Sequence, residues 1–73
     1  MIEHHFVICA ENTGYEASLE RRKLYEAISD PDADKHDQLR VIDESGEDYL
    51  YPKSFFIGVE LPQKVIDRIA LTA

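Results

Sequence analysis

The sequence contains no tryptophan, a single cysteine and no long apolar run. The lone Cys9 cannot form an internal disulfide, and its position inside a short apolar stretch favours a buried thiol. No stretch approaches the roughly 20 apolar residues that a transmembrane helix requires. The residues before Phe6 lack the positive charge of a signal peptide. These absences predict a soluble, cytoplasmic protein in a reducing compartment, with no membrane partner.

Basic residues are also scarce. The 73 residues include 8 lysines and arginines against 15 aspartates and glutamates, which gives a net charge of −7. Residues 29–48 carry eight of the acids and only two bases, a net charge of −6. Such an acidic field repels phosphate backbones, so the sequence predicts no nucleic-acid partner. The charge favours a basic protein partner, or serves solubility alone.

No pattern typical of catalysis, of a cofactor site or of a metal centre is present. The serines lack a nucleophile elbow and a glycine-rich oxyanion loop. His4 and His5 are adjacent, so on a strand they point to opposite faces and do not share one metal ion. The repeated acids from Asp30 to Asp34 resemble the start of a calcium loop, but the glycine and the final acid of that loop are missing. We expect a protein that is not an enzyme and that has no cofactor and no metal.

The apolar pattern predicts one small domain over residues 1–73, built mainly of strands. Consecutive apolar residues predict a first strand over Glu3–Ala10, buried on both faces. A long irregular loop then leads to a second strand over Lys23–Ile28. Good helix formers leave a helix near 17–28 as the alternative, which would make the fold α+β.

An acidic connector follows the second expected strand. Asp30 and Pro31 suit the N-cap and the first position of a helix, so a single helical turn is expected over Asp32–His36. Near the other end of the chain, Pro52 interrupts the strand pattern, and a last strand is expected over Phe55–Leu61.

The stretch Leu39–Phe56 predicts a tight β-hairpin and a proline-marked turn. With Ser45-Gly46 as a two-residue connection, Val41 faces Leu50 and Arg40 faces Tyr51. This register sets like charges opposite each other, which destabilises a hairpin by a few tenths of a kcal/mol per pair. A longer loop or a bound cation would relax the repulsion. The acidic tip consists of Asp43, Glu44, Glu47 and Asp48.

Pro62 is expected to open a short C-terminal helix. Apolar residues recur there at helical spacing, at Val65, Ile66, Ile69 and Ala70. We expect this stripe to pack on its own domain or, as the second choice, on another chain. The protein is accordingly expected to be a monomer or a weak homodimer through this helix.

The order of these elements resembles a Src-homology-3 barrel. The segment Tyr51-Pro52-Lys53-Ser54-Phe55-Phe56 is similar to the proline turn that precedes the last strand in that family. The resemblance implies an all-β, five-stranded barrel in which the long loop Glu11–Arg22 serves as the acidic ligand loop. It also implies ligand contacts at Pro52 and Phe55.

A second resemblance covers most of the chain. The run Asn12-x-Gly14-Tyr15-x-x-Ser18-Leu19-Glu20, together with the stretch 40–52, resembles a family of short bacterial proteins of unassigned function. That resemblance implies a small barrel that stands alone, and it implies no activity.

Two functions are consistent with these features. The first is a protein-interaction module that binds a basic or extended peptide on an exposed shelf. The shelf would consist of Tyr51, Pro52 and Phe55, with Tyr15 and Glu16 from the long loop. The alternative is an ion-responsive or structural accessory protein that uses the acidic tip.

Overall fold

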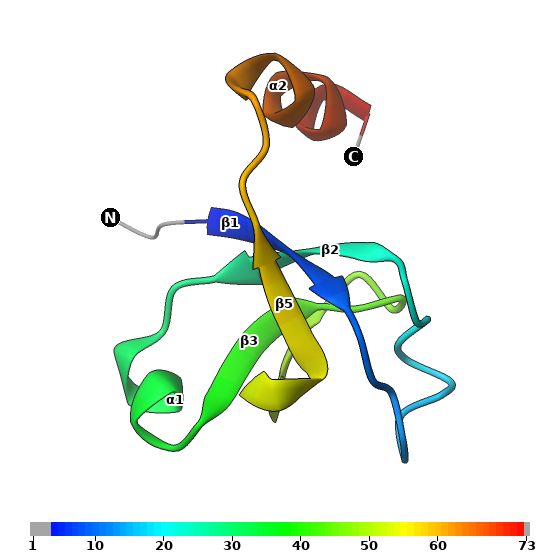
Figure 1. Cartoon of the computed structure of the whole chain (residues 1–73), viewed down its shortest axis with the longest axis vertical. Coiled ribbons are helices and arrows are strands. Elements are labelled where there is room, and N and C mark those ends of the chain that lie inside the picture. Colours follow the sequence, from blue (N-terminus) through cyan, green and yellow to red (C-terminus); the bar gives the residue numbers. More distant parts are fainter. Residues whose placement is uncertain (1–3, 73) are drawn as a thin grey trace.

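A computed structural model describes residues 4–72 of the chain (Figure 1). The predicted strand start at Glu3 lies outside the described residues. The elements in chain order are β1 (His4–Cys9), β2 (Leu24–Ile28), helix α1 (Pro31–Lys35), β3 (Gln38–Ile42), β4 (Asp48–Pro52), the 3-10 helix η1 (Lys53–Phe55), β5 (Phe56–Val59) and helix α2 (Gln63–Thr72). The predictions of a mostly β chain and of a C-terminal helix are confirmed.

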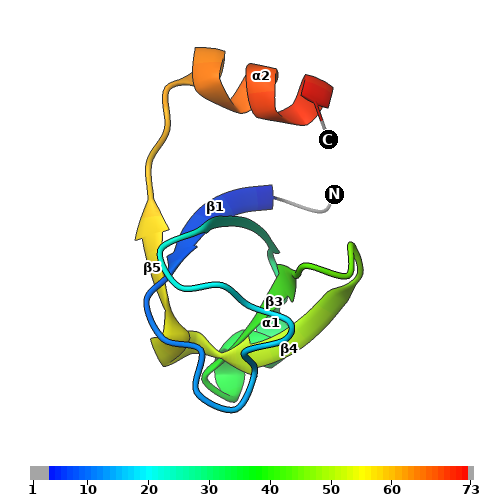
Figure 2. The ribbon, with the colours of Figure 1, turned by 90° about the vertical axis from the view of Figure 1, so that its right-hand side faces the viewer.

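The five strands form one antiparallel sheet in the order β4-β3-β2-β1-β5. The sheet curls around the core, as the view along its side shows (Figure 2). Its hydrogen-bonded ladder does not close, since β4 and β5 are its two edges. The two edges approach each other through side chains, where the rings of Tyr51 and Phe56 lie 6.2 Å apart. The expected closed barrel is therefore observed as a curled, open sheet.

The segment between β1 and β2 is a long loop, so the alternative of a helix near 17–28 is wrong. Arg22 adopts a left-handed backbone conformation with φ of 69° just before β2 begins, which a helix does not permit. In β2, Tyr25 and Ala27 point into the core and their neighbours are half-buried. This alternation is the strand pattern that the sequence carries over Lys23–Ile28.

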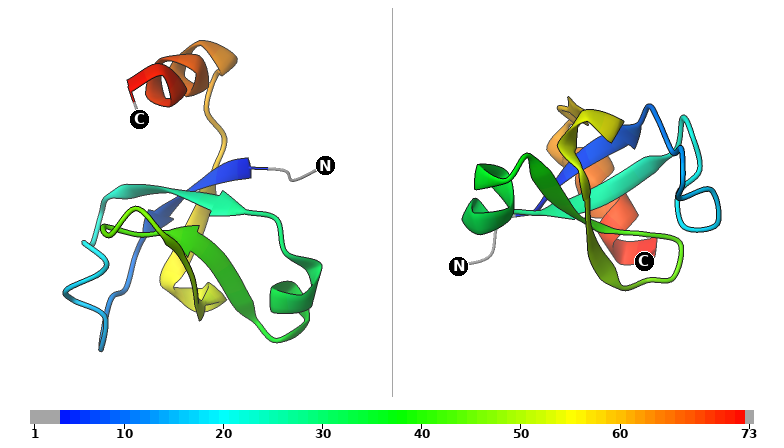
Figure 3. Two further views of the ribbon diagram at one scale, coloured as in Figure 1. Left: turned by 180° about the vertical axis from the view of Figure 1, so that it is seen from behind. Right: turned by 90° about the horizontal axis from the view of Figure 1, so that it is seen from below.

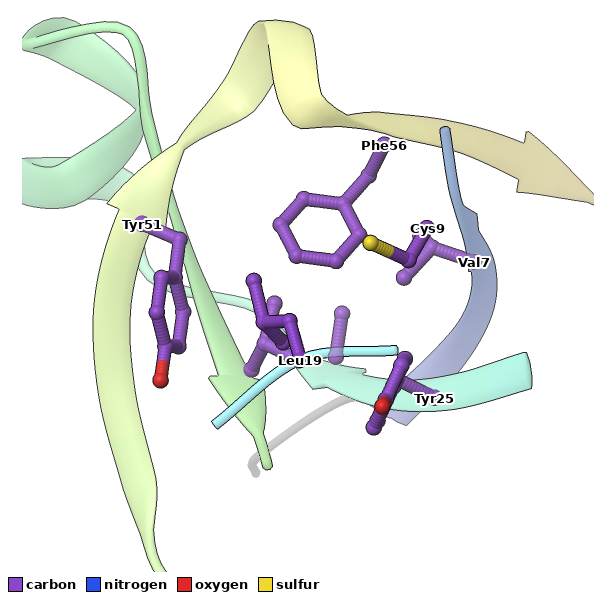
Figure 4. Close-up of a cluster of buried hydrophobic side chains, with 8 residues drawn as sticks. Val7, Cys9, Leu19, Tyr25, Tyr51 and Phe56 are labelled. Carbon is purple, nitrogen blue, oxygen red and sulfur yellow. The ribbon is translucent and has the colours of Figure 1, made fainter. Parts of the chain in front are cut away.

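The core is assembled from every strand and from the long loop (Figure 4). Leu19 reaches from the loop into the middle of the sheet and is almost fully buried. Cys9 is buried as well, and this burial raises the pKa of its thiol. The buried cluster consists of Val7, Cys9, Leu19, Tyr25, Ala27, Val41, Tyr51 and Phe56.

Helix α1 confirms the predicted helical turn. The carboxylate of Asp30 accepts hydrogen bonds from the backbone N–H groups of Asp32 (3.1 Å) and Ala33 (3.2 Å), which caps the helix. Pro31 occupies the first turn, where its missing N–H costs nothing. The other oxygen of Asp30 accepts from Nε of Arg40 at 2.8 Å and so ties α1 to β3.

The predicted hairpin exists, but its predicted register is wrong by one residue. Val41 pairs with Tyr49 and Arg40 pairs with Leu50, not with Tyr51. The N–H of Asp43 donates to the carbonyl of Glu47 at 3.1 Å, so the connection holds three residues, Glu44–Gly46. Gly46 has φ of +83°, which a three-residue connection with a left-handed third position requires. The extra residue removes the two expected like-charge pairs and leaves one such pair, Asp43 opposite Glu47.

The last strand begins one residue later than predicted. Phe55 belongs to η1, and β5 begins at Phe56, which points into the core. Ile57, the next residue, points outward and is exposed. The 3-10 turn after Pro52 takes up Lys53–Phe55 and so delays the start of the strand by one residue.

Helix α2 stands off from the sheet at the end of the extended segment 60–62 (Figures 1 and 2). Val65 is exposed and Ile66 is half-buried, while the side chains of Ile69 and Ala70 lie outside the described part. The expected docking of this helix on the sheet is not observed. In the described part of the chain, neither helix has the length and apolar character needed to cross a membrane.

Candidate functional site

The structure brings together three aromatic residues that the sequence assigned to one shelf. Tyr15, in the long loop, lies edge-on to Tyr51, with ring centroids 5.0 Å apart and an angle of 82° between the rings. It also lies edge-on to Phe55, at 5.9 Å and 72°. Such edge-to-face geometry is favourable between aromatic rings. The long loop is thereby anchored over the end of β4.

The exposed part of this region is different from the predicted shelf. Tyr51 is only 3% exposed, and Pro52 and Phe55 are half-buried. Tyr51 alternates inward along β4, because the register places it opposite Leu39 on the core face. Glu16 is exposed beside Tyr15 in the long loop. Tyr51 and Phe55 therefore support the surface from below instead of forming it.

A groove of about 380 Å³ lies between the long loop and β4. Three large side chains on it are exposed: Tyr15 by 41%, Tyr49 by 49% and Leu50 by 39%. The residues that line it are Tyr15, Ser18, Asp43, Ser45, Tyr49, Leu50 and Tyr51. Sequence reasoning missed Tyr49, Leu50, Ser18 and Ser45 as site residues. The wrong hairpin register hid Leu50, because it set Leu50 opposite the apolar Val41, and Val41 is buried.

The two walls of the groove are fixed to each other. The long loop and the hairpin connection lie side by side (Figure 3), and the N–H of Glu44 donates to the carbonyl of Ser18 at 3.1 Å. The carboxylate of Glu44 accepts from the Tyr25 hydroxyl at 2.5 Å and from Nζ of Lys23 at 2.6 Å. The Lys23 and Tyr25 hydrogen bonds lower the pKa of the Glu44 carboxyl. The groove therefore has a defined shape in the free protein.

Asp43 is the charged residue on the groove lining, and it is buried. Its carboxylate accepts from the hydroxyl of Tyr51 at 2.5 Å and from the backbone N–H of Ser45 at 2.9 Å. The Ser45 hydroxyl also donates to it, at 2.5 Å. Burial opposes the charge, but these bonds outweigh it and hold the pKa of Asp43 below its ordinary value. Asp43 therefore carries a negative charge at neutral pH.

The other partner of this buried pair is Tyr51. Burial and the neighbouring carboxylate of Asp43 raise the pKa of Tyr51 to about 12. The phenol consequently stays protonated at any physiological pH and remains a donor to Asp43. The pair fixes both the position of Tyr51 and the shape of the connection.

The acidic tip is divided among separate partners and does not converge. Asp43 and Glu44 bind Tyr51 and Tyr25, as described above. Glu47 accepts from the Tyr49 hydroxyl at 2.9 Å. Asp48 forms an ion pair of 3.0 Å with Arg40. Within residues 4–72, no three histidine, cysteine or acidic side chains are placed to hold a metal ion together.

A second hollow, of about 500 Å³, lies beside α1. Its charged groups are paired with each other, Arg40 with Asp30 and Lys53 with Asp34. Both pairs place a cation and an anion on the same wall, so the hollow has no dominant charge. The groove by Tyr49 differs, because its lining contains an acid and no base. We regard the smaller groove as the candidate site for this reason.

Support for a function of the groove comes from the residues of this chain. Comparison of the chain with models of protein families, with curated proteins and with solved structures finds no match.

Proposed function

We propose that this protein is a non-enzymatic interaction module that binds a basic, extended peptide in the groove between the long loop and β4. The observation that carries the proposal is a groove that combines exposed aromatic and apolar side chains with one charged residue, the acid Asp43. Tyr15, Tyr49 and Leu50 supply the exposed surface, and Asp43 supplies buried negative charge. Aromatic surface of this kind is enriched where proteins bind each other.

Basic side chains suit this surface for two reasons. Asp43 on the lining and Glu47 beside it are bound by hydroxyl and backbone N–H donors and not by a cation, so the local potential is negative. The faces of exposed tyrosines also attract guanidinium and ammonium groups, by about 0.5–1 kcal/mol at exposed sites. An arginine side chain gains from both terms and from stacking on a planar ring.

We also propose that the fold is a Src-homology-3-like barrel with an open ladder. The long first loop, the hairpin and the 3-10 turn before the last strand support this assignment. The contact between Tyr15 and Phe55 joins the two segments in which that family places its ligand contacts. The chain departs from the family where Phe55 lacks a tyrosine hydroxyl, and it has no tryptophan. Binding of a basic extended peptide is therefore a better expectation than binding of a polyproline peptide.

The test is a selection of random dodecapeptides, displayed on phage, against the immobilised wild-type protein. We expect enrichment of peptides rich in arginine and lysine. Replacement Tyr49→Ala should weaken the binding of an enriched peptide at least tenfold, about 1.4 kcal/mol. Replacement Ile57→Ala is the matched control, because Ile57 is exposed on β5 and does not line the groove. An empty selection, or equal affinity of the Tyr49→Ala protein, would contradict the proposal.

A further inference from the structure

We infer that the peptide is held by strand addition: it pairs as a sixth strand with the free edge of β4. The inference rests on the proposed function and states how the same groove recognises its ligand. Strand β4 is the end of the sheet, with β3 on one side and, within residues 4–72, no strand on the other. An edge strand offers a row of backbone donors and acceptors to an extended segment.

The register identifies which backbone groups of β4 point outward. The N–H of Asp43 donates to Glu47, and the N–H of Lys53 donates to Asp37 at 2.9 Å, so these two pairs are of the hydrogen-bonded kind. Antiparallel pairs alternate between hydrogen-bonded and non-hydrogen-bonded. The pairs Val41–Tyr49 and Leu39–Tyr51 are therefore hydrogen-bonded, and the pair Arg40–Leu50 between them is not.

It follows that Asp48, Leu50 and Pro52 direct their backbone groups away from β3. Asp48 and Leu50 each present an N–H and a carbonyl. Pro52 has no N–H, and it is the N-cap of η1, so its carbonyl belongs to that helix and adds nothing to the edge. No turn, loop or cap bond within residues 4–72 involves the backbone of Asp48 or Leu50. The free edge thus offers two donors and two acceptors in alternation.

The free edge and the groove coincide. Leu50 lines the groove and lies between Tyr49, which is exposed on the wall of the groove, and Tyr51, which is buried at its floor. Side chains of an added strand alternate between the two faces of the sheet. Those that share the face of Tyr49 meet Tyr15 and Asp43, where a positive charge is favoured.

The opposite face has a different character. There an added strand meets Leu50 and its cross-strand neighbour Arg40, which already binds Asp30 and Asp48. A second cation beside Arg40 is disfavoured, and an apolar side chain packs well on Leu50. The structure therefore assigns the ligand as an extended segment in which basic and apolar residues alternate.

The decisive variant is Leu50→Pro. It removes the outward N–H of Leu50 and leaves the hydrogen bonds between β3 and β4 intact, because Leu50 makes none of them. Leu50→Ala is the matched control, since it removes the side chain and keeps the N–H. Affinity for a peptide enriched in the selection above is measured for the wild type and for both variants, after thermal unfolding has confirmed that each is folded. We expect at least a tenfold loss for Leu50→Pro and a smaller loss for Leu50→Ala.

Amide hydrogen exchange on the wild-type protein tests the inference even if Leu50→Pro does not fold. The enriched peptide should slow exchange of the Asp48 and Leu50 amides at least tenfold and leave the already bonded Tyr49 amide little changed. Unaltered exchange at both outward amides, or full binding by Leu50→Pro, would overturn strand addition and leave the proposed function standing. Enrichment of proline-rich peptides without alternation would also overturn it. An empty selection would overturn the proposed function itself.

Discussion

The hydroxyl of Tyr51 donates a 2.5 Å hydrogen bond to Asp43, eight residues earlier in the chain. Tyr51 lies near the end of β4, and Asp43 begins the connection that precedes this strand. The bond is buried, and Asp43 is also held by Ser45. One side-chain pair therefore fixes the hairpin, the floor of the groove and the negative charge inside it.

Replacement Tyr51→Phe should lower the free energy of unfolding by about 1.5–3 kcal/mol, the range for a hydrogen bond to a charged group. The loss has two parts, since the bond disappears and the Asp43 carboxylate stays buried with one donor fewer. Urea denaturation at neutral pH measures it. Tyr49→Phe is the control, because the bond from Tyr49 to Glu47 is exposed to solvent. Equal effects of the two replacements would contradict the assigned role of the buried pair.

Acid should unfold the protein through Asp43 and Glu44. Both pKa values are lowered by folding from their ordinary values of 3.8 and 4.5. The stability that the two carboxylates contribute is therefore complete above those ordinary values and is lost as the pH falls through the folded values. The urea concentration at the midpoint of unfolding should decrease as the pH drops below about 4. The double variant Asp43→Asn, Glu44→Gln should show a weaker dependence of this midpoint on pH. A midpoint that is constant down to pH 2 would exclude this linkage.

Two glycines should respond to alanine with opposite signs. Gly46→Ala places a side chain at φ of +83°, which costs about 1–2 kcal/mol although the space around it is open. Gly58→Ala adds a side chain to an ordinary strand position with nothing within 4 Å, and should stabilise by about 0.5–1 kcal/mol. Thermal unfolding of both variants measures the difference. A neutral Gly46→Ala would mean that the connection is not held in the observed turn.

The hairpin illustrates where sequence patterns fail. Its strands and its location were predictable, because alternating apolar residues flank a turn sequence. Its register was not, since a two-residue and a three-residue connection both fit Ser45-Gly46. The choice depends on tertiary contacts, namely the bonds from Tyr51 to Asp43 and from Tyr25 to Glu44. No local pattern in the sequence contains those contacts.

The candidate site was predictable to a similar degree. The proximity of Tyr15, Tyr51 and Phe55 followed from the resemblance, and the structure has these rings in contact. Their exposure did not follow, because a shift of one residue exchanges the two faces of a strand. In the observed register Tyr51 lies in the core, and Leu50 lies at the surface. The helical turn at Asp30 was predicted correctly because its capping signal is entirely local.

Tyr25 should control how firmly the long loop is held. Its hydroxyl donates to Glu44 and accepts from the backbone N–H of Glu20 at 2.7 Å, so Tyr25→Phe removes both bonds and leaves a donor without a partner. We expect a loss of about 1.5–3 kcal/mol in stability. The amide of Glu44, which donates to Ser18, should also exchange faster.

Lys23, the exposed cation that also binds Glu44, provides the comparison with Tyr25. Lys23→Met removes the ion pair to Glu44 and keeps the tyrosine bond, and ion pairs at exposed positions contribute little. Exchange at the Glu44 amide should therefore change little in Lys23→Met. Faster exchange in Lys23→Met than in Tyr25→Phe would assign the hold on the loop to the ion pair instead.

The last prediction concerns helix α2, which stands off from the sheet although one side of it is apolar. Val65 is exposed, so Val65→Ser should leave the stability of a monomeric protein within about 0.5 kcal/mol of the wild type. If the apolar side instead packs on a second chain, the wild type will show a melting temperature that rises with protein concentration, and Val65→Ser will remove that dependence. Thermal unfolding over a hundredfold range of concentration, with sedimentation equilibrium as the independent measurement, separates the two. A stability loss in Val65→Ser that does not depend on concentration would show that α2 docks on its own sheet after all.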